Sequence, residues 1–277
     1  MVKISILMEN SGSGHRGLIA EHGLAIYIED DGHSILFDTG STDSFIQNAK
    51  LMRTDISRTE IVVLSHCHYD HTGGFPSFMD QWQAKNRLLV TGKDFLVDRF
   101  EQNSFAHTYL GVSFSSEDLA VHGIVHEEIV GARRLSPHCH AVSAFARSNV
   151  LEQVPAKFEK YDGVRFTHDD FTEECCIVIE ASEGLHVLVG CAHFGILNIV
   201  SHISALFARP VVGVYGGIHL FNSNRDEIHT VLDGLDELGV TRYGLCHCSG
   251  TLVQECLQTS PACRESATLS VGNVLFF

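Results

Sequence analysis

The sequence predicts a protein of the α/β class, because short β-rich runs alternate with amphipathic helical stripes along much of the chain. The run IVVLS at 61–65 is apolar and β-branched, as expected of a strand buried on both faces. The segment 196–207 instead repeats its apolar residues with helical spacing. Hydrophobic residues make up 44% of the 277 residues, enough for a substantial core. We expect a single domain over residues 1–277.

Turn and cap residues indicate the elements of the first half. Strand-like runs lie at 2–8, 24–30 and 34–40. The Asp31-Gly32 turn between the last two runs predicts a hairpin. A helix should begin near Thr42 or Asp43, either of which can act as the N-cap. Residues 92–170 show few periodic stretches, and we expect an insertion or lid there.

The second half repeats this pattern. Strand-like runs lie at 175–181, 185–189, 211–217, 243–246 and 269–277, and helical stripes lie at 196–207, 226–239 and 251–258. The turn Ser182-Glu183-Gly184 predicts a second hairpin between the first two runs. Gly239 can end the helix before it in a left-handed conformation. Each half is therefore expected to open with a hairpin and to continue with helices.

Four of the strand-like runs are each followed by a histidine and, close to it, a glycine. These histidines are His66 in IVVLSHCHYDHTGG, His193 in HVLVGCAHFG, His219 in VVGVYGGIHL and His247 in RYGLCHCSG. In sheets flanked by helices, functional groups gather at the carboxyl ends of strands, where the loops diverge and leave a crevice. We expect the four imidazoles to face one crevice.

The densest cluster is HxHxDH, formed by His66, His68, Asp70 and His71. Given the 18 histidines of the chain, chance would produce the pattern in roughly 0.4% of such sequences. The alternative is a polar loop with solvent-exposed histidines, but crowded imidazoles gain nothing from proximity unless a cation binds them. In an extended chain, the first two histidines project to the same side and can share one ion. Asp70 and His71 can hold a second ion.

The sequence resembles the metallo-β-lactamase superfamily, whose signature HxHxDH begins here at His66. LFDTG with Asp38, GCAH with His193 and LCHCSG with His247 follow the family's order. The resemblance implies a four-layer αββα sandwich with one or two metal ions at the edge between its sheets. It also implies that Asp38 orients the metal-binding loop through hydrogen bonds. The implied ligands are His66, His68 and His193 for the first ion, and Asp70, His71 and His247 for the second.

One position departs from the family pattern. Most dinuclear members have a bridging acid on the strand between the third and the last ligand histidines, whereas this strand ends in GGIHL, with His219 and no acid. A neutral imidazole bridges two cations poorly. Two roles stay open for His219, that of a metal ligand and that of a catalytic residue in contact with substrate. Asp70 is the second catalytic candidate, as a group that orients a nucleophile or accepts its proton.

A narrower resemblance is carried by AEHGLAIYI, GCAHFGILNIV, GGIHL and HCSGT. These segments are similar to the dihydropterin-ribofuranosylaminobenzene phosphate synthase-like branch of the superfamily, which has a dihydropteroate-synthase-type activity. Glu21 and His22 match its EHG element and are predicted to bind substrate, the alternative being a polar turn. Arg16, next to His15 in SGSGHRGL, is predicted to bind a substrate phosphate, the alternative being a mobile surface loop.

The predicted cofactor is zinc, as one or two ions. Nitrogen ligands with a single carboxylate suit zinc and also tolerate manganese or iron. His68 stands where the oxygen- and NO-reducing di-iron members of the superfamily have Glu. Cys67, Cys246 and Cys248 are near the ligands in sequence, but a structural role is favoured over thiolate ligation because Cys67 should point away from its neighbours.

These observations predict a metal-dependent hydrolase, or a dihydropteroate-synthase-like transferase, that acts on a small phosphorylated or pterin-type metabolite. An iron-containing redox protein and a metabolite-sensing module are the alternatives. The net charge of −15 argues against nucleic acid and anionic membranes as partners. With nine cysteines and no secretory leader or apolar span, we expect a cytoplasmic location. The oligomeric state stays open.

Overall fold

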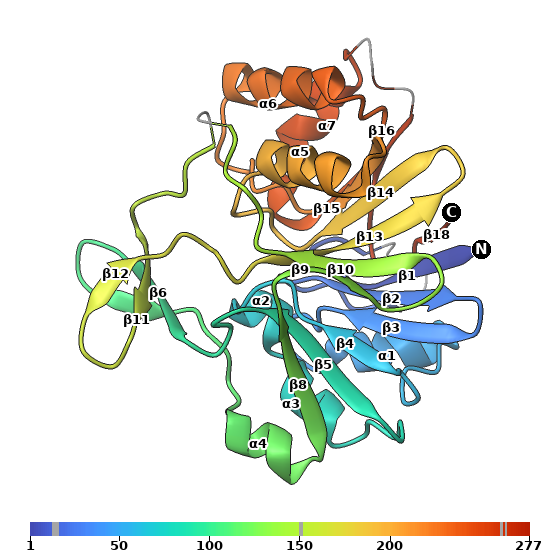
Figure 1. Ribbon diagram of the computed structural model, residues 1–277, viewed down its shortest axis with the longest axis vertical. Coiled ribbons are helices and arrows are strands. Elements are labelled where there is room, and N and C mark those ends of the chain that lie inside the picture. Colours follow the sequence, from blue (N-terminus) through green and yellow to red (C-terminus); the bar gives the residue numbers. More distant parts are fainter. Residues whose placement is uncertain (13–16, 150–151, 261–262, 264) are drawn as a thin grey trace.

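The computed structural model describes residues 1–12, 17–149, 152–260, 263 and 265–277. Within these ranges the strands form two seven-stranded sheets and one four-stranded sheet. The two large sheets pack face to face between two layers of helices, with α5, α6 and α7 on one outer side and α1, α2 and α3 on the other (Figure 1). The molecule therefore has four layers, as the αββα sandwich requires.

The first large sheet comes mainly from the N-terminal half. In spatial order its strands are β18 (Val274–Phe276), β1 (Val2–Met8), β2 (Ala25–Asp30), β3 (His33–Phe37), β4 (Ile61–Val63), β5 (Arg87–Gly92) and β8 (Ile124–Ile129). The hairpin predicted at Asp31-Gly32 joins β2 to β3 and is confirmed. Strands β3, β4, β5 and β8 run parallel, so their carboxyl ends lie at the same edge.

The second large sheet comes mainly from the C-terminal half. Its spatial order is β17 (Glu265–Thr268), β16 (Arg242–Leu245), β15 (Val211–Gly216), β14 (Gly184–Val189), β13 (Cys175–Ala181), β10 (Cys139–Ser143) and β9 (Gly131–Arg134). The second predicted hairpin joins β13 to β14 and is confirmed. Strands β14, β15, β16 and β17 run parallel. Three strand-end histidines thus start from one sheet edge.

The described residues contain the four helices that the sequence predicted, close to their predicted limits, and three short helices that it did not predict, over 69–72, 75–79 and 116–121. In chain order, the helices are α1 (Ser44–Leu51), α2 (Tyr69–Thr72), α3 (Phe75–Met79), α4 (Ser116–Val121), α5 (Ile196–Phe207), α6 (Arg225–Glu237) and α7 (Thr251–Leu257), with a 3₁₀ turn at His247–Ser249. Asp43 occupies the predicted N-cap position of α1, but its side chain accepts no hydrogen bond from the helix backbone. Gly239 follows α6 with φ of 92°, which fits its predicted role at the helix end. No described helix is long and apolar enough to cross a lipid bilayer.

Alternating side chains of the strands build three separate cores. Ile4 and Ile6 of β1 point between the two sheets, where they meet Ile177 and Leu188 of the second sheet. Val187, one position from Leu188, points to the opposite face and packs under α5, α6 and α7. The helices α1 and α3 cover a third core on the outer face of the first sheet. The period of two along each strand thus produces the layers.

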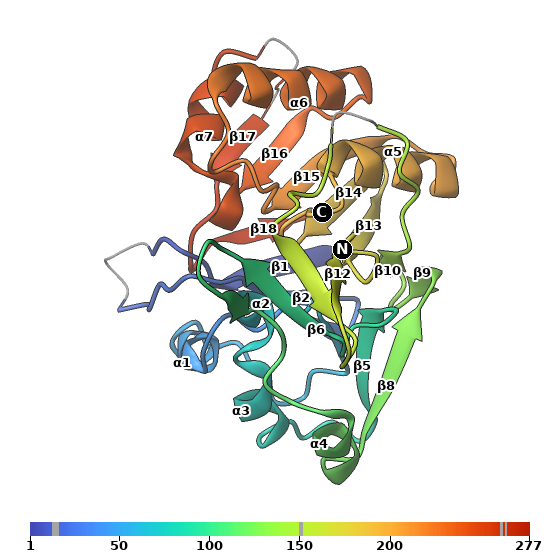
Figure 2. The ribbon, with the colours of Figure 1, turned by 90° about the vertical axis from the view of Figure 1, so that its left-hand side faces the viewer.

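The sequence predicts an insertion or lid over residues 92–170. The structure differs from this, because the segment does not form one continuous insertion. Strands β8, β9 and β10 belong to the two large sheets, and only β6 (Asp98–Gln102), β7 (His107–Tyr109), β11 (Phe158–Tyr161) and β12 (Phe166–His168) form the separate four-stranded sheet. This small sheet lies across the edge of the sandwich (Figure 2). The prediction failed because short strands of mixed exposure carry no clear periodicity.

The last strand is also shorter than predicted. The run 269–277 is interrupted by a turn, in which Asn273 accepts hydrogen bonds from the backbone N–H and the hydroxyl of Ser270. Gly272 takes φ of 93° in the same turn. Only Val274–Phe276 pairs with β1, while β17, which the sequence did not predict, extends the second sheet beside β16.

Candidate metal centre

The predicted ligands converge where the strand ends of the two large sheets meet. His66 and His68 follow β4 of the first sheet, and α2 then places Asp70 and His71 on one short helical turn. His193 and His247 follow β14 and β16 of the second sheet. Each of these six side chains is at least nine-tenths buried.

His66, His68 and His193 form the first group. Their ligand nitrogens lie within 4.8 Å of one another. The ring of His193 has its centroid 4.9 Å from the centroids of both His66 and His68. In the described part of the chain, the Nε2 atoms of His66 and His68 have no hydrogen-bond partner. Buried polar atoms without a partner are costly, and a bound cation would satisfy them.

Asp70, His71 and His247 form the second group. Asp70 Oδ2 lies 3.3 Å from His247 Nε2 and 3.7 Å from His71 Nε2, and the two histidine nitrogens are 3.2 Å apart. His22, which the sequence assigned to substrate, also reaches this group, with Nε2 at 3.1 Å from Asp70 Oδ2. The donors of both implied metal sites are therefore assembled in the fold, and they fit zinc by type and spacing.

Carboxylates behind the ligands fix their orientation. Asp38 accepts from the backbone N–H and hydroxyl of Ser65 and lies 2.7 Å from His71 Nδ1. Ser65 Oγ is also 2.9 Å from His66 Nδ1. Asp38 is fully buried, so one carboxylate holds both the strand end and a ligand histidine. This is the contact that the resemblance implied for Asp38.

The C-terminal ligands have their own supports. Glu174 accepts from the backbone N–H groups of His193 and Phe194, at 2.9 and 2.6 Å. Burial raises the pKa of Glu174 to about 8. Glu9 accepts from the backbone N–H of His247, and Asn10 Oδ1 lies 2.9 Å from the Nδ1 atom of that histidine. Segments from the start, middle and end of the chain thus meet at one centre.

Burial sets the protonation of the three histidines in the first donor group. It lowers the pKa of His68 to about 3. Burial, with the nearby histidines adding to it, also holds the pKa values of His66 and His193 well below the ordinary range. Burial opposes the ionisation of Asp70, but His71 and hydrogen bonds from His22 and His247 outweigh it and keep the pKa of Asp70 low. The imidazoles of the first group are therefore neutral, which is the state that binds a cation. In the second group, burial opposes protonation of His247, but the hydrogen bond to Asp70 outweighs it and raises the pKa of His247.

The metal-free protein should lose stability as the pH falls below about 6.5. A histidine whose folded pKa is depressed takes up its proton only on unfolding, so the unfolded state binds more protons between pH 6.5 and the lowered folded pKa, which is about 3 for His68. Three such histidines give a slope of up to about 4 kcal/mol per pH unit. Urea titrations of EDTA-treated protein between pH 5 and 7.5 measure it. His68→Gln should reduce the slope by about 1.4 kcal/mol per unit, and an unchanged slope would contradict the assignment.

A buried ion cluster holds the metal-binding loop against the small sheet. Arg99 of β6 pairs with Asp169 at 2.7 Å and with Glu173 at 3.2 Å. Cys67, between the first two ligand histidines, directs its Sγ to Glu173 Oε1 at 3.7 Å. Cys67 therefore points away from the ligands, as predicted. Sequence reasoning missed Arg99, because nothing local marks a partner 70 residues away.

Other predicted and missed residues lie as follows. Glu21 contacts the backbone and hydroxyl of Thr42 and lines neither cavity described below, so its contact with substrate stays a prediction. Arg16 and His15 lie outside the described residues. Cys191 was missed entirely, although its Sγ is 3.2 Å from His71 Nε2. The signal that could have found it is its position in GCAH, two residues before a ligand.

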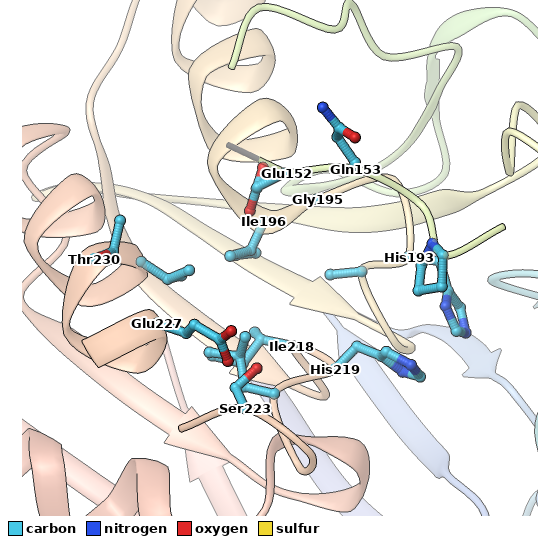
Figure 3. A pocket seen from close by; sticks show the side chains of 14 residues that line it. Glu152, Gln153, His193, Gly195, Ile196, Ile218, His219, Ser223, Glu227 and Thr230 are labelled. Atoms are coloured by element: carbon cyan, nitrogen blue, oxygen red, sulfur yellow. The ribbon is translucent and has the colours of Figure 1, made fainter. Parts of the chain in front are cut away.

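Two cavities adjoin the histidines. The smaller, about 180 Å³, lies over the second group and is lined by His22, Asp70, Lys157 and Phe158 among others. The larger, about 540 Å³, extends toward α5 and α6 and is lined by Glu152 and Glu227. His193 and His219 line both cavities. Their rings lie side by side, with centroids 4.2 Å apart (Figure 3).

Residues 19–199 match the model of the metallo-beta-lactamase superfamily. The chain belongs to this superfamily. As the resemblance implied, the predicted metal ligands lie at the edge between the two sheets of an αββα sandwich. The matched range includes the HxHxDH segment that begins at His66 and the strand β14, which leads to His193. The sequence resemblance is thereby confirmed at the level of the family.

Individual proteins resemble the chain over most or all of its length. The 7,8-dihydropterin-6-methyl-4-(beta-D-ribofuranosyl)-aminobenzene-5'-phosphate synthase of Methanocaldococcus jannaschii is 26% identical over 265 residues, which cover 90% of this chain and 88% of that protein. The crystal structure of Tm1679, a metal-dependent hydrolase of the β-lactamase superfamily, has a TM-score of 0.84 at 25% identity, covering 100% and 99%. Zn(2+)-bound PqqB from Methylobacterium extorquens shares the fold, with a TM-score of 0.56 at 12% identity, covering 99% and 100%.

Proposed function

We propose that this protein is a zinc-dependent enzyme with two ions, and that it acts on a small phosphorylated metabolite of the pterin type. The observation that carries the proposal is the assembly of two adjoining donor groups. In the first group, the buried Nε2 atoms of His66 and His68 have no hydrogen-bond partner among the described residues. The pterin assignment is supported by the synthase of Methanocaldococcus jannaschii. In this proposal His66, His68 and His193 hold one ion, and Asp70, His71 and His247 hold the other.

In this proposal the zinc ions, Asp70 and His219 have different roles in the reaction. When bound, zinc ions act as Lewis acids that polarise a substrate oxygen and neutralise charge on a leaving group. Asp70 Oδ2 faces the smaller cavity together with His22 and can accept a proton there. His219 lies at the junction of the two cavities, and its Nδ1 has no hydrogen-bond partner within the described residues. We assign His219 to contact with substrate.

The cavities differ in charge, and this difference supports a substrate with two unlike ends. The described lining of the larger cavity contains Glu152 and Glu227 but no lysine or arginine. Both carboxylates already accept backbone N–H groups, and Glu152 Oε2 accepts two N–H groups of Asn198. Oε1 of Glu152 and the oxygens of Glu227 keep a further lone pair. Such a lining accepts a neutral ring rich in N–H donors. Lys157 and the ions attract the anionic end in the smaller cavity.

Group transfer is the reaction that fits such a substrate best. The bond between the methyl carbon of a pterin and its diphosphate would break, and the diphosphate would leave with the electron pair. The nitrogen of an aromatic amine would bond to the carbon and release its proton to a base, for which Asp70 is placed. Hydrolysis is the second candidate, favoured by the likeness to Tm1679, with water as the nucleophile in place of the amine.

One assay separates the candidates. Zinc-loaded protein is incubated with a hydroxymethyl-dihydropterin diphosphate, with and without an aromatic amine, and the products are resolved by chromatography. Synthase activity predicts a coupled product that requires the amine, whereas hydrolysis predicts the same products in both incubations. Tight binding of the pterin without turnover would instead indicate a sensing module. Iron with reversible redox colour in the purified protein would contradict the zinc assignment.

A further inference from the structure

Cys191 lies between the two donor groups of the metal centre. It follows Gly190 directly after β14, and its side chain is 3% exposed. Its Sγ shares a 4.8 Å cluster with ligand atoms of His66, from the first group, and His71, from the second. The distance from Sγ to His71 Nε2 is 3.2 Å. No other described cysteine falls in a cluster with members of both groups.

Gly190 explains how the sulfur reaches this place. A Cβ atom at Gly190 would lie 2.1 Å from Ser65 Oγ and 3.1 Å from Asp38 Oδ2. Only a glycine lets the end of β14 approach so closely to the strand end that carries the metal-binding loop. The next side chain, that of Cys191, is thereby set against ligands from the opposite sheet.

The predicted ligands carry little negative charge for two divalent ions, so one more anionic ligand would stabilise the centre. Two divalent ions would face a single ligand carboxylate, Asp70, and neutral imidazoles, and two cations a few ångströms apart repel strongly when buried. The nearby carboxylates are committed elsewhere. Asp38 accepts from Ser65, and Glu174 accepts from the backbone at His193. The strand end at Gly217-Ile218-His219 supplies no acid either.

We propose that the Cys191 thiolate is a ligand shared by the two ions and supplies the negative charge that a bridging acid would otherwise provide. The inference rests on the dinuclear zinc centre of the proposed function and goes beyond it by assigning a ligand. Thiolate is a preferred ligand of zinc, and a sulfur with several lone pairs can bind two ions at once. The Cys191 sulfur would bind both the ion held by the group of His66 and the ion held by the group of His71.

Cys248 offers a matched control. Its Sγ accepts from the backbone N–H of His219 at 3.3 Å and clusters with Cys191 and His219, but with no member of the two histidine groups. It is as buried as Cys191 and similarly close to a ligand in sequence. If proximity alone produced metal–sulfur bonds, both cysteines would ligate. The shared-ligand proposal requires Cys191 alone.

Zinc-edge X-ray absorption of the wild-type protein loaded with two zinc ions counts the sulfur neighbours. A shared thiolate gives one sulfur at about 2.3 Å per zinc. Half a sulfur per zinc would mean that Cys191 or Cys248 binds one ion only, and no sulfur would mean nitrogen and oxygen ligands alone; either result overturns the inference and leaves the zinc enzyme intact. A protein that binds no zinc would overturn both.

Cobalt-substituted variants then identify the sulfur. The wild type and Cys248→Ser should show the thiolate-to-cobalt charge-transfer band, and Cys191→Ser should lose it together with at least about 10-fold in affinity for the second ion. Cys191→Asp should lose the band but keep two ions. A band that persists in both Cys191 variants, or that disappears in Cys248→Ser, would overturn the assignment. Should Cys191→Ser fail to fold, Cys191→Asp and the wild-type sulfur count still decide.

Discussion

His68→Ala is expected to reduce turnover by at least about 10³-fold while the chain still folds. The substitution removes a ligand of the first ion, and the Lewis acid accounts for several kcal/mol of transition-state stabilisation. The fold should persist because the free imidazole is buried without a partner for Nε2 in the described structure. Steady-state assays with the pterin diphosphate, together with zinc content by mass spectrometry, measure both effects.

His229→Ala is the control for this substitution. His229 is exposed on α6 and takes no part in the donor groups of the described chain. Its replacement should change neither zinc content nor turnover, and it should alter stability by less than about 0.5 kcal/mol. Normal turnover by His68→Ala, with zinc still bound, would show that His68 is not a metal ligand.

Arg99→Leu should destabilise the protein by about 3–5 kcal/mol. It leaves Asp169 and Glu173 as buried charges without their cation, and removing one partner of a buried ion cluster costs far more than the intact cluster contributes. Denaturant unfolding measures the loss. Because Glu173 also contacts Cys67, the variant should in addition weaken zinc binding.

Two further variants identify the cause of this loss. Adding Glu173→Gln to Arg99→Leu should recover part of the stability, since one uncompensated charge disappears. Arg165→Ala, which removes an exposed arginine 3.9 Å from Asp162, should cost no more than about 1 kcal/mol. Equal losses for Arg99→Leu and Arg165→Ala would show that the buried cluster has no special role.

Much of the fold and the centre could be predicted because their signals are local. The turns at Asp31-Gly32 and Ser182-Glu183, and the start of α1 after Asp43, are short-range features, and the structure has each where it was expected. The signature that begins at His66 concentrates four donors in six residues. The strand-end pattern then located His193 and His247, because strands of one direction end at one edge.

The features that escaped prediction depend on contacts between distant segments. Arg99 and Glu173 are 74 residues apart in sequence, and their pairing depends on how the small sheet folds over the sandwich. Cys191 looked like one of several buried thiols, since only the approach of β14 to Ser65 reveals its neighbours. His22, predicted to bind substrate, lies beside a ligand carboxylate because the loop before β2 packs against α2 of the same sheet, where the backbone N–H of Leu24 donates to the carbonyl of Asp70.

The central claim is that imidazoles from both sheets hold metal at one centre, and anomalous diffraction at the zinc edge tests it most directly. Crystals of the zinc-loaded protein should show two peaks. We expect one peak among His66, His68 and His193, and the other among Asp70, His71 and His247. Peaks at unrelated surface residues, or none in this cluster at saturating zinc, would contradict the account.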